Sequence, residues 1–279
     1  MAIRLFCILA ALFFSSAAQA CDLSPETRPT RVADFAASAF ECLHNPPDGY
    51  RFEPELEADF IRLVNDTRQR AGLAPLDHRP ELVQAARYHS LDMMANAYFR
   101  HEGLRGRNHA DRIAALDRRL FWQAARENLA KIEGRTNKVA ELLHDSLMDS
   151  PSHRANILAR NVDHIAVGVT RRGKEVLVTQ LFVAEAGALS ADAPLRLAPD
   201  EPFRPFVMLD GYRFAGFRAD AGEETFIPFT AAPDGRWLAP PEIRGDAVIE
   251  ARGEQAGAHR GVISYIYLRG PAFSLNDVR

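Results

Sequence analysis

Three stretches of the chain repeat apolar side chains with the period of an amphipathic helix. They span residues 55–71, 80–97 and 137–151. In the second stretch one face carries Leu82, Ala85, Ala86, His89 and Met93. Asn137 is a favoured N-cap residue and Pro151 cannot continue a helix, so these two residues are expected to bound the third helix.

Two β-rich runs follow the helices, at residues 165–170 and 176–183. A short polar segment with a glycine joins them, which is typical of a hairpin. Residues 100–112 are rich in Gly, Arg and His and are expected to form a loop. Helices followed by strands predict an α+β fold.

The composition changes after residue 187. Residues 188–205 are rich in proline and alanine and are expected to be a linker. Residues 206–279 contain several short runs of aromatic and β-branched residues, separated by Gly and Pro, which favours a small all-β module. The runs are 207–209, 212–217, 225–229, 247–251 and 262–268.

Residues 1–20 have the order of a secretory signal peptide. Arg4 precedes an apolar run at residues 5–14, and small residues end at Ala20. The run is shorter than the roughly 20 apolar residues that span a bilayer. We expect cleavage after Ala20 and a secreted or periplasmic protein with no transmembrane segment in the mature chain.

Cys21 and Cys42 remain after cleavage, in an expected N-terminal strap at residues 21–52. An even pair in an oxidising compartment predicts one disulfide, closed around a helical segment at residues 30–44. Acylation of Cys21 as a lipoprotein is the second alternative. Ala18 stands where a lipid-attachment site usually has leucine.

The charge balance argues against nucleic-acid binding. The chain has 34 Lys and Arg residues and 37 Asp and Glu residues. Cleavage would remove Arg4 and no acidic residue, so the mature protein stays slightly acidic. A nucleic-acid-binding protein normally has a basic excess.

Several strong catalytic signatures are absent from the sequence: there is no G-x-S-x-G, no Gly-rich phosphate loop and no paired C-x-x-C. His101-Glu102 resembles the start of a zinc-protease H-E-x-x-H motif, but Arg105 replaces the second histidine. Polar residues that interrupt apolar patterns remain as candidates. They are His101, Glu127, Asp149, Ser150 and His153.

The segments around these residues resemble the bacterial branch of the CAP superfamily, also called SCP or PR-1-like. The resemblance covers residues 56–184, within an expected domain at 53–187. The segments that carry the resemblance are residues 63–68, 72–76, 98–101, 126–130, 148–158, 167–169 and 179–183. The resemblance implies an α-β-α sandwich with a wide cleft where two histidines and acidic residues converge.

Carried over residue by residue, His101 is the first histidine of that cleft, Glu127 its acidic residue and His153 its second histidine. A further glutamate of animal and plant relatives corresponds to Ser150, beside Asp149. Arg126, Leu147 and Ser152 also depart from the family pattern, where glycine, tryptophan and glycine are usual. Next to Glu127, the Arg126 guanidinium could keep the carboxylate ionised by lowering its pKa.

Three roles for this cluster remain open. Two imidazoles and one carboxylate, from His101, His153 and Glu127, are a ligand set that zinc and similar divalent ions accept. Alternatively, Glu127 caps backbone amides and both histidines hydrogen-bond to it, which orders a polar pocket without a ligand. Direct catalysis is the third role.

Two functions from different classes follow. One is an exported binding module that holds a lipid, glycan or protein partner in the cleft, and an edge of Met93, Met94, Tyr98 and Phe99 could admit an acyl chain or sterol. The alternative is a weak metal-assisted hydrolase of peptide, ester or cell-wall material.

No activated nucleophile accompanies the histidines, because the neighbours Ser152 and His153 do not point at one another. The sequence therefore favours binding.

Overall fold

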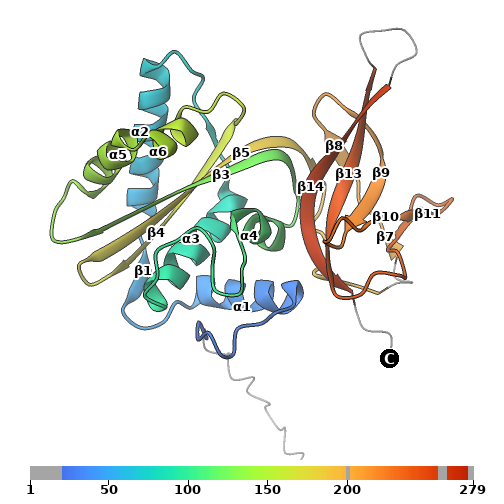
Figure 1. The fold of residues 1–279 in the computed structure, drawn as a ribbon, viewed down its shortest axis with the longest axis horizontal. Helices are drawn as coiled ribbons and strands as arrows, with labels where there is room; N and C mark the ends of the chain where they lie inside the picture. Colours follow the sequence, from blue (N-terminus) through green and yellow to red (C-terminus); the bar gives the residue numbers. More distant parts are fainter. Residues whose placement is uncertain (1–20, 199–201, 257–262, 276–279) are drawn as a thin grey trace, which may run out of the picture.

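The computed structural model describes residues 21–198, 202–256 and 263–275, so the expected signal peptide lies outside the described residues (Figure 1). The helices are α1 (Val32–His44), α2 (Pro54–Arg70), α3 (Pro80–Ala95), α4 (His109–Leu116), α5 (Val139–Asp149) and α6 (Pro151–Ile157). The longer strands are β3 (Leu120–Glu133), β4 (His164–Arg172), β5 (Glu175–Leu189), β9 (Arg213–Asp220), β13 (Asp246–Ala256) and β14 (Ile263–Leu275). The shorter ones are β1 (Tyr50–Phe52), β2 (Asp77–His78), β6 (Arg196–Leu197), β7 (Pro202–Phe203), β8 (Val207–Leu209), β10 (Phe226–Pro228), β11 (Thr230–Ala231) and β12 (Trp237–Leu238).

One sheet runs through both halves of the described chain, in the order β1-β4-β5-β3-β14-β13-β9-β10. In its first half, α2, α5 and α6 cover one face, and α1, α3 and α4 cover the other (Figure 1). This arrangement confirms the expected α+β fold with an α-β-α sandwich. The second half consists of strands and short connections among the described residues, as expected for a β module.

Strand alternation divides the apolar residues of the first half into two cores. On β4, Ile165 and Val167 pack toward α2 and α5, whereas Ala166 packs toward α1 and α3. On β5, Phe182 and Leu181 divide in the same way. Successive side chains of a strand point to opposite faces, so one hairpin supplies both cores.

Helix α3 lies directly on β4 at Gly168. A β-carbon at this position would lie 2.1 Å from the backbone nitrogen of Arg87, which is far inside van der Waals contact. The Ser90 hydroxyl donates to the Gly168 carbonyl at 2.9 Å and forms a 2.8 Å hydrogen bond with Thr179 on β5. Glycine is therefore required here by close packing of helix on sheet.

The structure corrects two expectations about helices. Residues 100–112 are not all loop, because α4 begins at His109 after a capping box between Asn108 and Asp111. Such a box satisfies the free amides at a helix start and is visible in the sequence. Asn137 is not the N-cap of α5; Lys138 occupies that position without a side-chain cap. The expected break at Pro151 is confirmed, and α6 starts there.

Strand β3 is the main element that the pattern did not predict. Its residues do not alternate cleanly between apolar and polar, since charged Arg126, Glu127 and Lys131 interrupt them. The reason is its position between β5 and the β module, where one of its faces lines a polar site. Glu127 and Asn128 are buried within it.

The expected disulfide is confirmed: Cys21 and Cys42 are bonded, and Cys42 is fully buried. A sulfur in a disulfide cannot carry a lipid, so the acylation of Cys21 is not supported. The strap is also held by Arg28, whose two terminal nitrogens donate to the Asp92 carboxylate of α3 at 2.7 and 2.5 Å. The first residues after the expected cleavage site are thus part of the folded domain.

The predicted strands of the C-terminal part are present, and β13 and β14 extend beyond the predicted runs. Val262, the predicted start of the last run, lies outside the described residues. Residues 188–205 carry the end of β5 together with β6 and β7. The expected boundaries between the strap, the CAP domain, the linker and the β module, at 52/53, 187/188 and 205/206, stay predictions.

A buried arginine connects the two halves. Arg118 donates to the Ala114 carbonyl in α4, the Ala193 carbonyl beyond β5 and the Ala272 carbonyl on β14. Because β3 and β14 pair only through Trp122 and Arg269 in the described ladder, these bonds add to the junction. No helix in the described part of the chain is long and apolar enough to cross a bilayer.

Candidate functional site

The centre of the site is the carboxylate of Glu127 on β3, whose side chain is 1% exposed. Glu127 Oε1 accepts a hydrogen bond from His101 Nδ1 at 2.9 Å. Glu127 Oε2 accepts one from Arg112 Nη2 at 2.5 Å. The fold thus brings His101 and Glu127 into direct contact, although 26 residues separate them.

The ionisation of Glu127 follows from these contacts. Burial alone raises the pKa of its carboxyl group, but the charge of Arg112 and the hydrogen bond from His101 lower it further than burial raises it. The net pKa lies below its usual value. An ionised carboxylate only accepts hydrogen bonds, so His101 donates to it from Nδ1.

Arg112, on α4, was expected only as part of a basic loop. Besides Glu127, it donates from Nη1 to the carbonyls of His101 and Arg107, at 3.1 and 2.8 Å. This one guanidinium therefore holds both the carboxylate and the loop that carries His101. The capping box of α4 is the sequence feature that could have identified Arg112, because it places this residue one turn into a helix that begins beside His101.

The expected role of Arg126 is wrong. Its guanidinium is not paired with Glu127 but lies near Asn156 Oδ1 at 3.4 Å and Asn161 Oδ1 at 3.2 Å. Neighbouring residues of a strand point in opposite directions, so the Arg126 guanidinium is directed away from the Glu127 carboxylate. Arg112 has the charge-compensating role instead.

A second histidine lies near Glu127, but it is His89 of α3 rather than His153. His89 is fully buried, with Nε2 3.0 Å from the Arg100 carbonyl and 4.0 Å from Glu127 Oε1. Burial, followed by the charge of Arg112, lowers the pKa of His89 to about 3. His89 is thus neutral near pH 7 and donates to the carbonyl, and its buried Nδ1 has no hydrogen-bond partner among the described residues.

His153, on α6, approaches the site through its backbone. Asn128 Nδ2 donates to the His153 carbonyl at 3.1 Å, and Asn156 Nδ2 donates to Asn128 Oδ1 at 2.9 Å. The His153 ring is partly buried. Burial, and then electrostatic repulsion from His101, lower its pKa.

Asn128 and Asn156 were not singled out by sequence reasoning, although both lie in the segments that carry the family resemblance. Asn156 also donates to the Glu127 carbonyl at 3.1 Å. Together they attach α6 to β3. The position of His153 depends on this amide network.

Ser150 and Asp149 do not join the cluster. Ser150 is the N-cap of α6, and its hydroxyl lies 3.3 Å from the Ser152 hydroxyl. Asp149 is the exposed last residue of α5. Glu127 is therefore the carboxylate that His101 and Arg112 contact.

A cleft of about 620 Å³ opens on this cluster. Apart from Gly106, the residues that line it have polar or charged side chains, and His109 is one of them. The lining residues are His101, Glu102, Gly106, Asn108, His109, Arg126, Glu127 and Asn156. His101 is more than half exposed, so its imidazole ring is accessible to a ligand.

The residues around Glu127 do not fit a divalent metal ion. Both carboxylate oxygens already accept hydrogen bonds, and one donor is a permanent cation that would repel a metal. Among residues 21–198, 202–256 and 263–275, no three His, Cys, Asp or Glu side chains are grouped as a metal site requires. Of the two histidines expected to bond to Glu127, His101 does so, at 2.9 Å.

Residues 61–182 match the CAP family, described as the cysteine-rich secretory protein family. The Bacillus subtilis (strain 168) protein YkwD, described as uncharacterized, is 33% identical over 129 residues, which are 46% of this chain and 47% of the relative. The match thus spans about half the length of that relative.

Two solved structures are similar over 47% of this chain. An outer surface protein from Borrelia burgdorferi has a TM-score of 0.41 and 20% identity, over 93% of its own chain. An extracellular protein containing an SCP domain from Bacillus anthracis str. Ames has a TM-score of 0.41 and 28% identity, over 41% of its chain.

Proposed function

Since residues 61–182 of this chain are a CAP domain of the bacterial type, we propose that the domain is an exported binding module whose cleft holds a polar ligand. The ligand class is a glycan or a protein segment. Export is supported by the disulfide between Cys21 and Cys42, which is typical of oxidising compartments, and by the signal-peptide pattern of residues 1–20.

The observation that carries this proposal is the state of Glu127. A general base needs a carboxylate that can receive a proton from substrate, and a metal ligand needs a free oxygen. Glu127 has neither property, because Arg112 and His101 occupy both oxygens and keep its pKa low. Its role is to orient His101 and the loop of residues 101–107, which form one wall of the cleft.

The lining favours a polar ligand over a lipid. Hydrogen-bonding groups of His101, Asn108, Arg126 and Asn156 face the cleft, and lipid chains offer these groups no partners. In the apolar edge expected to admit an acyl chain, Met93 and Met94 are buried, at 0% and 5% exposed, whereas Phe99 is 40% exposed. These methionines belong to the core.

Binding can be measured with the mature protein, residues 21–279, on a panel of muropeptides, neutral oligosaccharides, peptides and phospholipid vesicles. We expect a muropeptide, oligosaccharide or peptide to bind, and His101→Ala and Arg126→Ala to weaken that binding about tenfold through lost hydrogen bonds. His44→Ala is the matched control, because His44 lies on α1, away from the cleft lining.

Two results would overturn the proposal. Equal binding by wild type and both cleft variants would place the ligand elsewhere. Hydrolysis of peptide, ester or cell-wall substrates that requires zinc and disappears in His101→Ala would establish the metal-assisted hydrolase instead.

A further inference from the structure

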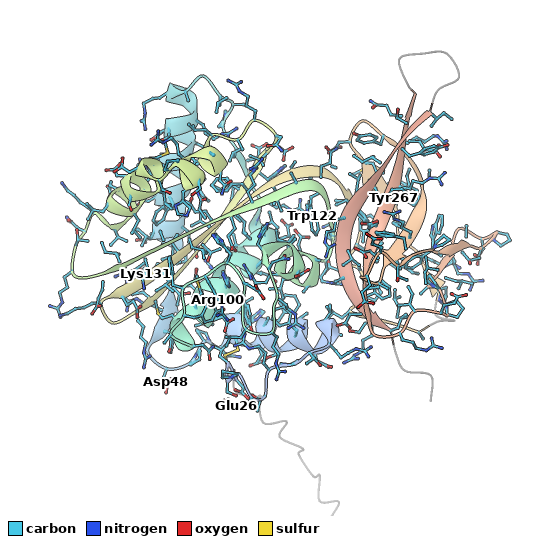
Figure 2. The ribbon with its side chains drawn as sticks, in the orientation of Figure 1. Glu26, Asp48, Arg100, Trp122, Lys131 and Tyr267 are labelled. Atoms are coloured by element: carbon cyan, nitrogen blue, oxygen red, sulfur yellow. A yellow bond between two sulfur atoms is a disulfide. The ribbon has the colours of Figure 1, made fainter. Side chains whose placement is uncertain are left out.

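One face of the C-terminal sheet carries exposed aromatic rings. Tyr265 and Tyr267 on β14 are 56% and 42% exposed, and Phe226 on β10 is 44% exposed. Figure 2 shows Tyr267 on β14, two residues from the pairing of Arg269 with Trp122. We call these three rings the aromatic platform. The opposite face of the same strands is core, where Ile249 and Leu268 are fully buried.

Arginine side chains fill the spaces between the rings. The Arg218 guanidinium lies 4.0 Å from the Phe226 ring centre and 3.3 Å from that of Tyr267. Arg252 lies 4.8 Å from the Tyr265 ring centre. Stacking of this kind restricts ring rotation, so the platform is ordered before any ligand arrives.

Each of these arginines is neutralised by a carboxylate. Arg218 Nε donates to Glu250 at 2.6 Å, and Arg252 Nη2 donates to Glu254 at 2.8 Å. Glu254 also pairs with Arg213. Both glutamates are 8% exposed, and Glu254 is held between Arg213 and Arg252. The face thus combines exposed rings with compensated charge.

This combination identifies the chemistry of the partner. An anionic polymer needs uncompensated positive charge, and Glu250 and Glu254 compensate most of the charge of Arg213, Arg218 and Arg252. Insertion into a membrane needs several exposed aliphatic side chains, and Ile263 is the aliphatic residue that the described part of this strand exposes. A neutral sugar ring has an apolar face of C–H groups for stacking and hydroxyls at its edge for guanidinium and carboxylate groups.

The platform continues toward the CAP domain. Arg269, on the same face of β14, pairs with Asp220 at 3.3 Å and with Asp111 of α4 at 3.2 Å. These three residues line a cavity of about 420 Å³ between the two halves, and Gly106 lines both this cavity and the cleft at Glu127. Two neighbouring cavities thus extend the surface, which suits a chain of several sugar units.

We propose that the aromatic platform binds an extended neutral glycan by stacking on Tyr265, Tyr267 and Phe226. This site lies on β9, β10, β13 and β14 and is separate from the His101 cleft. The proposal does not depend on the function of the CAP domain.

The test is affinity electrophoresis and calorimetry of the full mature protein with cellohexaose and chitohexaose. We expect binding, about tenfold weaker in Tyr265→Ala/Tyr267→Ala, from the loss of two stacking rings. Tyr265→Leu/Tyr267→Leu should weaken binding similarly, because leucine keeps apolar area but has no ring face. Phe206→Ala/Met208→Ala is the control, since these residues are 65% and 63% exposed on or beside β8.

His101→Ala should bind both hexamers like wild type, which separates this site from the cleft. Circular dichroism should show that every variant keeps its fold, as expected for exposed positions. Absence of hexamer binding, or wild-type affinity in the Tyr→Leu pair, would overturn the proposal. Vesicle binding or self-association that depends on these tyrosines, without hexamer binding, would also overturn it and identify a membrane or a second copy as the partner.

Discussion

The guanidinium of Arg112 and the carboxylate of Glu127 form a buried ion pair, with 2.5 Å between Arg112 Nη2 and Glu127 Oε2. Their side chains are 3% and 1% exposed. The pair connects α4 to β3 and, through the His101 carbonyl, to the cleft wall. It is therefore both a structural link and the reason that Glu127 stays ionised.

Arg112→Met should destabilise the protein by about 3 to 5 kcal/mol, because it leaves a buried carboxylate without its cation. Urea unfolding followed by circular dichroism measures this loss. Arg126→Met is the control; its guanidinium contacts asparagine side chains rather than a carboxylate, so it should cost about 1 kcal/mol or less. Similar losses in both variants would contradict the assignment of Arg112 as the partner of Glu127.

His89 should make stability depend on pH. Its folded pKa of about 3 lies below its unfolded value of 6.5, so between these values the unfolded chain binds the additional proton. Stability should therefore be complete above about pH 6.5 and fall as the pH decreases toward 3, by up to about 1.4 kcal/mol per pH unit. Urea unfolding at several pH values between about 5 and 6.5 measures this dependence. The free energy of unfolding should change less with pH in His89→Gln than in wild type. Parallel slopes would show that His89 does not remain neutral in the fold.

Gly168→Ala should cost at least about 3 kcal/mol or prevent folding, because the new methyl group would meet the backbone of α3. Thermal unfolding and soluble yield measure the effect. Gly173→Ala is a matched control on the same hairpin: Gly173 has a φ of +59° but no atom within 4 Å of an added methyl group. It should lose only about 1 kcal/mol.

Cys21→Ser/Cys42→Ser should lose roughly 3 kcal/mol, since the unfolded chain is no longer constrained by the loop. The wild-type mature protein should show no thiol that reacts under denaturing, non-reducing conditions. Arg28→Met offers a comparison, because it releases the same strap from Asp92 without changing the disulfide. Two reactive thiols in the wild type would contradict the bridge.

The sequence pattern was sufficient to predict those helices and strands that bury one face and leave the other face polar. The apolar faces of α2 and α3 and the hairpin of β4 and β5 could be predicted because their side chains repeat with the period of the element. The pairing of Cys21 with Cys42 followed from their number, and the family motifs brought His101 and Glu127 together as candidates.

Strand β3 and helix α4 were decided by tertiary structure. Glu127 interrupts the apolar pattern of β3 because a buried guanidinium compensates it, and local sequence does not reveal a partner 15 residues away. Charge compensation of Glu127 was expected from Arg126 but comes from Arg112 for the same reason. The side chain of the adjacent Arg126 points away from Glu127 along the strand, whereas Arg112 reaches the carboxylate from α4. Charges interact through space, so their partners depend on how the elements pack, whereas helical and strand periodicity depends only on neighbours along the chain.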